Sequence, residues 1–130
     1  MLANAAVTTI LPVKNMERAR KFYVETLGLK PLGFAPDGNF VLACGSGAQI
    51  ALITKPEGTK AEHTALSFDV ADVRKEIAEL ERRGVVFEEY DLPGLKTVNH
   101  VCVLGSMKAA WFRDPEGNYL CLHEGVDVKA

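Results

Sequence analysis

The residues best suited to chemistry lie near the C-terminus, in the stretch "DPEGNYLCLHE" from Asp114 to Glu124. Cys121 and His123 are two positions apart on an expected strand, so their side chains share one face. With His63 from an earlier strand they could form a thiolate nucleophile, or a soft site for zinc or copper. A free cysteine inside a fold more often acts as a small hydrophobe. We expect this last role for Cys121, and the other two remain alternatives.

An internal repeat supplies the elements that must position these residues. Thr8 to Leu29 and His63 to Val85 each run from alternating apolar residues, typical of a strand, into apolar residues at helical spacing. Asn15 and Asp72 stand where each helix would begin, and both are favoured N-cap residues. A glycine follows each apolar helical stretch as a stop signal. Both halves therefore predict a strand followed by a helix.

Strand-like segments separated by turn signals follow each expected helix. In the first half they are "NFVLACG" and "QIALIT", and in the second "VVFEEYDL", "HVCVLG", "KAAWFR" and "NYLCLH". We therefore predict a single domain, residues 1–130, built from two β-α-β-β-β modules. Module one covers about residues 5–54, a linker covers 55–62, and module two covers about residues 63–125.

Side chains alternate between the two faces of a strand, so each expected strand has a helix-facing set and an opposite set. The helix-facing set is apolar and consists of Leu11, Val13, Leu66, Phe68, Val70, Leu120 and Leu122. The opposite set is smaller and more polar and consists of Thr8, Ile10, Pro12, His63, Ala65, Ser67, Asp69, Tyr119, Cys121 and His123. An open cleft lined by the second set would suit a small ligand.

The bulk properties limit the kind of partner. The chain has 130 residues, 48% of them hydrophobic, and a net charge of -2. It lacks the basic surface that nucleic acid or anionic lipid requires, and no apolar stretch approaches the length of a membrane span. Three cysteines without C-x-x-C spacing favour free thiols and a cytoplasmic location. We expect a small organic molecule as partner, with neither nucleic acid nor membrane.

Two motifs resemble those of a known family. The helix ending "RARKFYVETLGL" (Arg18 to Leu29) and the late segment "AAWFRDPEGNYLCL" (Ala109 to Leu122) are similar to the glyoxalase/bleomycin-resistance/extradiol-dioxygenase family, the vicinal oxygen chelate superfamily. The resemblance implies an α+β fold in which two paired β-α-β-β-β modules form a curled mixed sheet around a cleft, in a homodimer. It also implies a divalent metal ion in the cleft, held by His, Gln or Glu side chains from the first and last strand of each module.

The positions of those family ligands carry other residues in this chain. They fall on Thr8, close to Ala51, on Ala65 and on Cys121. His63, two residues before Ala65, would supply only one ligand, and a single imidazole does not hold a catalytic divalent ion against water. We therefore predict no bound metal and no other cofactor, and we assign no catalytic residue.

The expected function is metal-independent binding of a small organic molecule, similar to the drug-sequestering branch of that family. The residues expected on the cleft wall are Thr8, His63, Ser67, Trp111, Tyr119, Cys121 and His123. The loop from Tyr90 to His100 is the expected flap over them. One alternative is an enzyme, either a lyase, isomerase or dioxygenase with displaced metal ligands, or a metal-free catalyst using His63 or Cys121. Another is a dimeric interaction module with a vestigial cleft.

Overall fold

The computed structural model describes residues 1–126, and they divide into two compact units. The first unit contains Met1–Ala61 and the short segment Asp114–Asn118. The second contains Glu62–Arg113 and the chain from Tyr119 onward. One turn from the second half of the chain therefore belongs to the first unit.

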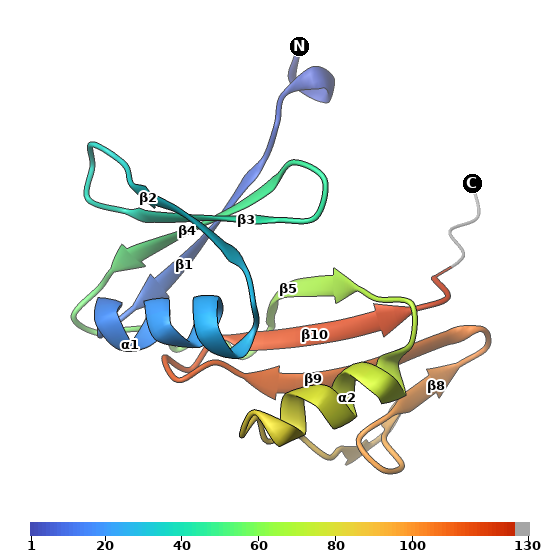
Figure 1. Cartoon of the computed structure of the whole chain (residues 1–130). Helices are drawn as coiled ribbons and strands as arrows, with labels where there is room; N and C mark the ends of the chain where they lie inside the picture. Colours follow the sequence, from blue (N-terminus) through green and yellow to red (C-terminus); the bar gives the residue numbers. More distant parts are fainter. Residues whose placement is uncertain (127–130) are drawn as a thin grey trace. The chain divides into compact units, whose positions relative to one another are not determined.

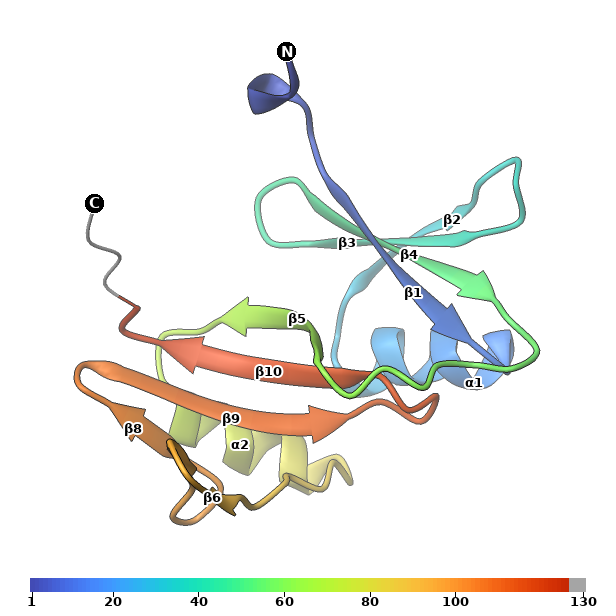
Figure 2. The same cartoon turned by 180° about the vertical axis from the view of Figure 1, so that it is seen from behind.

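The first unit is a mixed four-stranded sheet with a helix against one face (Figure 1 and Figure 2). The strand order is β1-β4-β3-β2, with β1 and β4 parallel and the other pairs antiparallel. The elements in chain order are a 3-10 turn η1 (Leu2–Asn4), β1 (Thr8–Val13), α1 (Met16–Lys21), a π-helical turn η2 (Phe22–Thr26), β2 (Lys30–Phe34), β3 (Phe40–Cys44) and β4 (Ala48–Thr54). Leu11 and Val13 of β1 are buried, as their alternation predicts.

The predicted N-cap of α1 is confirmed. The Asn15 side chain accepts a hydrogen bond from the backbone N–H of Arg18 at 3.0 Å. After Lys21 the helix widens into η2, which buries Tyr23. Gly28 follows with a φ of 76°, a left-handed conformation that glycine adopts without steric cost. It therefore ends the helical segment where the sequence predicts a stop.

The second unit repeats this arrangement, with α2 against one face of a sheet ordered β5-β10-β9-β8 (Figure 1 and Figure 2). Strands β5 and β10 are parallel, and the other pairs are antiparallel. The elements are β5 (Thr64–Asp69), α2 (Val73–Arg82), the short hairpin of β6 (Asp91–Leu92) and β7 (Leu95–Lys96), β8 (Cys102–Leu104), β9 (Met107–Arg113) and β10 (Tyr119–Glu124). The expected α+β fold of two β-α-β-β-β modules with mixed sheets is thus confirmed.

Two carboxylates hold the start of α2. The predicted N-cap, Asp72, accepts a hydrogen bond from the backbone N–H of Lys75 at 3.2 Å. Glu124, at the end of β10, accepts one from the backbone N–H of Val73 at 2.9 Å. This places negative charge at the helix N-terminus, where the helix dipole favours it. The buried residues of the helix, Val73, Ile77 and Leu80, are apolar residues at helical spacing, as the sequence pattern of His63 to Val85 predicts.

The turn "DPEGN" packs against the start of α1 within the first unit. Glu116, whose side chain is fully buried, accepts hydrogen bonds from the backbone N–H groups of Lys14 and Asn15 at 2.8 and 2.9 Å. It also pairs with Arg18 Nε at 2.6 Å. Burial by itself raises the pKa of this carboxyl, but the hydrogen bonds outweigh burial, so the pKa of Glu116 is lowered. Glu116 thus satisfies donors that the start of a helix leaves unpaired.

Asp114 stabilises the same turn by accepting hydrogen bonds from the backbone of the turn itself. Its buried carboxylate accepts hydrogen bonds from the backbone N–H groups of Glu116 and Asn118 at 2.9 and 2.8 Å, and from the Tyr23 hydroxyl at 2.6 Å. Burial, together with this carboxylate, raises the pKa of Tyr23, so the hydroxyl stays a donor. The Asn118 side chain donates to the Pro12 carbonyl at 3.0 Å. The motif therefore links two parts of the chain that are far apart in sequence.

Two predictions about strands are wrong. The segment "VVFEEYDL" is not a continuous strand: it makes an isolated bridge between Phe87 and Phe112, and only Asp91–Leu92 pairs further, in the short hairpin. Strand β2 is absent from the predicted segments because Pro31 and Gly33 interrupt its apolar alternation. Proline and glycine are tolerated there because β2 lies at the edge of its sheet.

A β-bulge corrects the predicted alternation at the start of β5. Tyr119 pairs with Thr64, but Leu120 pairs with Leu66, so Ala65 is the extra residue. The alternation holds from Leu66 onward and fails before it. Thr64, and not Ala65, therefore shares a face with Tyr119.

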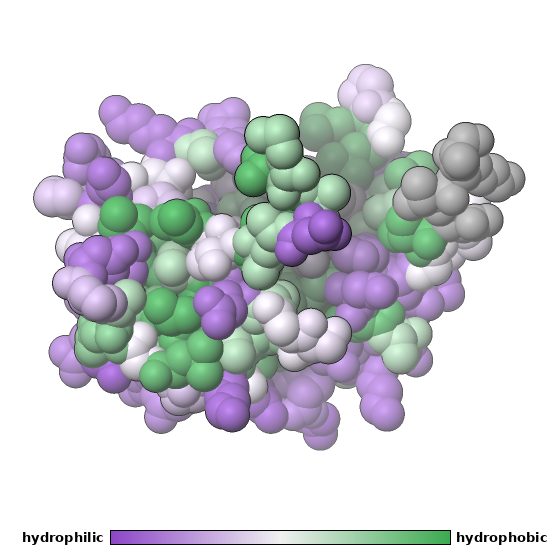
Figure 3. Space-filling view, turned by 90° about the horizontal axis from the view of Figure 1, so that it is seen from above, coloured by the Kyte–Doolittle hydropathy of each residue, from purple (hydrophilic) through white to green (hydrophobic). Residues whose placement is uncertain are grey.

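Apolar side chains remain exposed at two places. Figure 3 shows the N-terminal segment nearest the viewer as mostly hydrophobic, and Met1, Leu2 and Val7 are exposed there. Val103 and Leu104 of the edge strand β8 are also more than half exposed, at 53% and 56%. Within residues 1–126, no helix has the length and apolar character needed to cross a membrane.

Candidate functional site

The register of the second sheet places three of the predicted site residues in one row. Ser67 of β5 pairs with Cys121 of β10, which pairs with Trp111 of β9. Neighbouring strands lie about 4.8 Å apart, so the row spans about 10 Å. The alternate residues Phe112 and Leu120 are buried on the side of α2. The row lies on the opposite side, here called the polar face, formed by Thr64, Ser67, Asp69, Tyr90, Trp111, Arg113, Tyr119, Cys121 and His123.

Aromatic side chains cover one end of the polar face. Trp111 Nε1 donates a hydrogen bond to Thr64 Oγ1 at 3.1 Å, which fixes the indole plane. The Tyr90 ring meets Trp111 edge-on, with centroids 5.7 Å apart and an interplanar angle of 83°. The Arg113 guanidinium lies over the Tyr119 ring, 5.4 Å from its centroid. These rings and the adjacent cation form a surface suited to a planar aromatic ligand.

The segment after α2 brings Tyr90 to this face. The backbone N–H of Glu88 donates to the Trp111 carbonyl at 2.8 Å, and the Glu88 carboxylate accepts from Arg113 Nε at 2.8 Å. Residues two apart on an extended segment share a face, so Tyr90 lies on the same side as Glu88. Burial, and next the charge of Glu88, raises the pKa of Tyr90. Its hydroxyl therefore stays protonated and can donate to a ligand.

Hydrogen-bonding groups occupy the other end of the polar face. Ser67 Oγ and His123 Nδ1 lie 2.5 Å apart. His123 Nε2 is 3.8 Å from Asp69 Oδ1, which is longer than a hydrogen bond. A serine–histidine–aspartate triad requires the aspartate to orient the imidazole by a hydrogen bond, and that contact is missing here. The geometry therefore supports polar contacts to a ligand better than nucleophilic catalysis by Ser67.

Cys121 lies between these two ends and is buried. Burial raises the pKa of its thiol by more than the neighbouring Ser67 hydroxyl lowers it. A cysteine nucleophile needs a lowered pKa and access to the substrate. The activated thiolate considered for Cys121 is therefore not supported. Cys121 is instead a small, uncharged side chain between the aromatic and hydrogen-bonding ends of the polar face.

The residues at the implied metal-ligand positions do not fit a divalent metal. Ala51 and Ala65 have no side-chain donor, Thr8 offers only a neutral hydroxyl, and the Cys121 thiol is held in its protonated form by burial. Among residues 1–126, no three His, Cys, Asp or Glu side chains are grouped closely enough to hold a metal ion.

Five of the seven predicted site residues share the polar face: Ser67, Trp111, Tyr119, Cys121 and His123. Thr8 belongs to the sheet of the first unit, where it is exposed at the start of β1. His63 is exposed and precedes β5. It also precedes the bulge at Ala65, so the alternation that holds from Leu66 onward does not extend to it.

Four residues of the polar face are missing from the seven predicted site residues: Thr64, Asp69, Tyr90 and Arg113. Asp69 belongs to the opposite set that the alternation predicts, but not to the seven. Thr64 is missing because the bulge at Ala65 reverses the alternation there. Tyr90 is missing because it stands where the predicted strand "VVFEEYDL" meets the expected flap, and the sequence analysis assigns no strand face to that segment. Arg113 could have been found from the sequence, since it stands two positions after Trp111 on the same strand.

Comparisons with known proteins show the family. A family model described as Glyoxalase/Bleomycin resistance protein/Dioxygenase superfamily matches residues 5–122. No curated protein sequence gives a match. Among solved structures, TnmS3, an antibiotic binding protein from Streptomyces sp. CB03234, is 27% identical with a TM-score of 0.74, covering 97% of this chain and 99% of that chain. A lactoylglutathione lyase from Agrobacterium tumefaciens is 19% identical with a TM-score of 0.71, covering 96% of each chain.

The fold and the polar face define a protein of the paired β-α-β-β-β class, with one mixed sheet and one α-helix in each described module. The chain belongs to the Glyoxalase/Bleomycin resistance protein/Dioxygenase superfamily. Its structural neighbours include both a binding protein and a lyase. Because one fold can support both, the choice between binding and catalysis depends on the chemistry of the site.

Proposed function

We propose that this protein binds a small planar organic molecule on the polar face of its second sheet and needs no metal ion to do so. The arrangement of the face carries the proposal. Trp111, Tyr90 and Tyr119 form an aromatic end, and Ser67 with His123 forms a hydrogen-bonding end across Cys121. An apolar surface with a few polar groups that fix orientation is the usual composition of a small-molecule site.

Two further observations support binding over catalysis. The neighbour TnmS3, at 27% identity over nearly the whole chain, is described as an antibiotic binding protein. At the implied metal-ligand positions, Ala51 and Ala65 also offer no side-chain donor. The Thr8 hydroxyl and the Cys121 thiol lack the charge and basicity that would hold a catalytic divalent ion.

Fluorescence of Trp111, the single tryptophan, tests the proposal directly. Titration with a panel of planar aromatic compounds that includes anthraquinone-2-sulfonate is expected to give saturable quenching. Replacing Tyr119 with Leu should weaken binding of that compound about two- to tenfold, the usual effect of losing one aromatic contact. Ala78→Ser is the matched control. Ala78 is exposed on α2, which covers the face of the sheet opposite the polar face, so this variant should bind as the wild type does. Absence of saturable quenching across the panel, or equal affinity in Tyr119→Leu, would refute the proposed function.

The same titration tests metal independence. Protein treated with EDTA and then dialysed should bind anthraquinone-2-sulfonate with an affinity within about twofold of the untreated protein, since no metal contact is lost. Binding that disappears on chelation and returns with added zinc or magnesium would contradict this part of the proposal.

A further inference from the structure

Glu89 connects the Tyr90 segment to the loop after the β6–β7 hairpin. Its Oε1 accepts hydrogen bonds from the backbone N–H of His100 at 2.5 Å and from the Thr97 hydroxyl at 3.1 Å. Thr97 is buried, and its Oγ1 accepts a hydrogen bond from the backbone N–H of Tyr90 at 2.8 Å. The Thr97 backbone N–H donates to the Tyr90 carbonyl at 2.9 Å. One carboxylate therefore lies between His100 and the backbone that carries the Tyr90 ring.

The loop around His100 has an unusual backbone. Asn99 and His100 have φ values of 51° and 73°, a left-handed conformation that is uncommon for residues other than glycine, although Asn and His adopt it more readily than most. Val98 and Val101 close the loop with two mutual backbone hydrogen bonds. Two consecutive residues of this kind persist only where surrounding contacts hold them. The hydrogen bond from the His100 backbone to Glu89 is one of those contacts.

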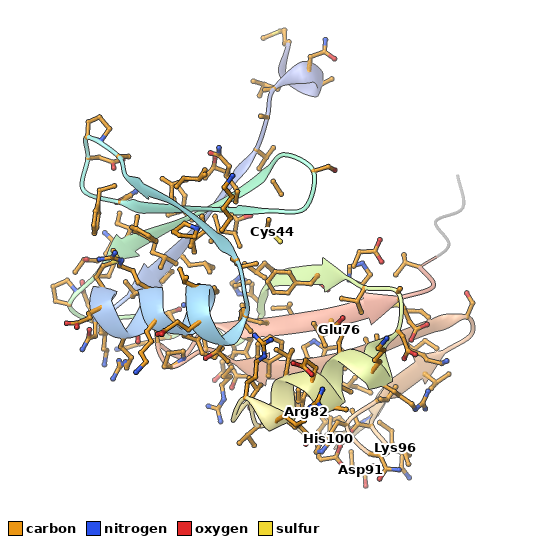
Figure 4. The ribbon with its side chains drawn as sticks, in the orientation of Figure 1. Cys44, Glu76, Arg82, Asp91, Lys96 and His100 are labelled. Carbon is orange, nitrogen blue, oxygen red and sulfur yellow. The ribbon has the colours of Figure 1, made fainter. Side chains whose placement is uncertain are left out.

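The His100 ring lies between two carboxylates, beside α2 (Figure 4). Its Nδ1 is 3.1 Å from Glu89 Oε1 but is not aligned for a hydrogen bond and has no hydrogen-bond partner among the described residues. Its Nε2 is 3.6 Å from Glu81 Oε2. A neutral imidazole has one N–H donor, and a protonated imidazole has two. Only the protonated ring therefore carries an N–H on each side and a positive charge that attracts both carboxylates.

His100, Glu81 and Arg74 line a hollow of about 400 Å³, whose remaining lining residues are uncharged. Asp91 and Lys96, both labelled in Figure 4, are partners across the two strands of the β6–β7 hairpin, so their opposite charges face each other. Glu81 and Glu89 are the carboxylates that lie within 4 Å of the His100 ring nitrogens in the described part of the chain.

We propose that His100 is a pH-responsive positioning residue for the polar face. Protonation of its ring draws Glu81 and Glu89 toward it, and Glu89, through Thr97, then holds Tyr90 in edge-on contact with Trp111. Deprotonation removes the positive charge that attracts the two carboxylates, and the Tyr90 segment is held less firmly. The effect on ligand affinity rests on the proposed function, whereas the effect on the Tyr90–Trp111 contact does not.

The size of the effect follows from the exposure of the groups. The side chains of His100, Glu81 and Glu89 are 30%, 47% and 55% exposed, so solvent screens their interaction. A partly exposed ion pair changes an equilibrium by up to about fivefold. The affinity for anthraquinone-2-sulfonate, whose sulfonate does not titrate in this range, should thus be about two- to fivefold higher at pH 6 than at pH 8.

The decisive experiment uses the ligand-free protein. Trp111 gives the single indole N–H signal in a ¹H–¹⁵N NMR spectrum, and imidazoles are the side chains that normally change charge between about pH 5 and 8. The sequence has 3 histidines, so the double variant His63→Asn, His123→Asn leaves His100 alone. The indole signal of this variant should still shift with pH. In His100→Asn it should not shift in the same way, and asparagine tolerates the left-handed backbone there.

The outcomes separate this inference from the proposed function. A pH-dependent indole shift that persists in the double variant and is lost in His100→Asn supports the positioning role, whether or not anthraquinone-2-sulfonate binds. If the probe binds and its pH dependence is also lost in His100→Asn, the link to affinity is supported. An indole signal that titrates equally in His100→Asn and wild type, with both folded by circular dichroism, would overturn the inference even if the probe binds.

Discussion

Glu116 and Asp114 show how far single residues of this chain depart from their usual environment. Acidic residues in a Pro-Gly turn are normally solvated, yet both of these are buried. Each is accepted in the interior because backbone and side-chain donors surround it, including Lys14, Asn15 and Tyr23. These carboxylates link the turn to the start of α1, a role that local sequence does not reveal because the donors lie about a hundred residues away.

Replacing Glu116 with Gln should lower the free energy of unfolding by about 1–3 kcal/mol. The amide oxygen can still accept from the backbone N–H groups of Lys14 and Asn15, but the charge-assisted contact with Arg18 is lost. Urea denaturation measures the change. Glu57→Gln, at an exposed loop position, is the control and should stay within about 0.5 kcal/mol of wild type. Equal stability of the two variants would contradict the role assigned to Glu116.

The same carboxylate predicts a pH dependence of stability. The pKa of Glu116 is lower in the folded protein than the value of about 4.3 expected for an unfolded chain. Its contribution is therefore complete above about pH 5 and is lost as the pH falls through the folded-state pKa. Unfolding curves between pH 6 and pH 3 should show a smaller loss of stability in Glu116→Gln than in wild type. Parallel losses in both proteins would be inconsistent with this sign.

Cys121 is expected to be unreactive in the folded protein. Its thiol is buried and its pKa is raised, which limits both access and the thiolate fraction. Among the free cysteines, Cys102 is also buried and Cys44 is half-buried. Mass spectrometry after iodoacetamide treatment at neutral pH should find Cys44 modified first and Cys121 modified only after denaturation. Early modification of Cys121 would restore the activated-thiolate alternative.

At the scale of elements, the sequence predicts those with periodic signals and misses those without. The caps Asn15 and Asp72, and the alternation that buries Leu11 and Leu120, are correctly predicted because each depends on neighbours along the chain. The bulge at Ala65 is not predictable in this way, because it depends on pairing with a distant strand. For the same reason the sequence identifies most of the candidate site on β9 and β10 and misses Thr64 and Tyr90.

The start of α2 provides an element-level prediction. Glu124→Gln should lower the free energy of unfolding by about 0.3–1 kcal/mol, because it removes a negative charge from the helix N-terminus while keeping an acceptor for Val73. Guanidinium or thermal unfolding monitored by circular dichroism checks the value. Glu62→Gln, an exposed residue before β5, is the matched control. A variant as stable as that control would show that the charge of Glu124 contributes nothing to α2.

At the scale of the whole molecule, the exposed apolar residues favour association with a second copy. Met1, Leu2 and Val7 at the N-terminus and Val103 and Leu104 on the edge strand β8 are exposed. Unpaired edges with apolar side chains tend to pair with another chain. This agrees with the homodimer that the sequence resemblance implies, and the homodimer stays a prediction.

Light scattering coupled to size-exclusion chromatography tests that prediction. We expect a mass of about twice the 14.2 kDa of one chain at micromolar concentration. The variant Val103→Lys, which adds charge to the edge of β8, should shift the equilibrium toward the monomer if β8 takes part. A mass of one chain for the wild-type protein at every concentration would contradict the homodimer.

The central claim is that the polar face of the second sheet binds a planar small molecule. NMR mapping of backbone amides during titration with anthraquinone-2-sulfonate tests it most directly. We expect the largest shifts in β5, β9 and β10 and in the indole signal of Trp111, with saturation and with no requirement for added metal. Shifts confined to the first unit, or no saturable shift at all, would contradict the account.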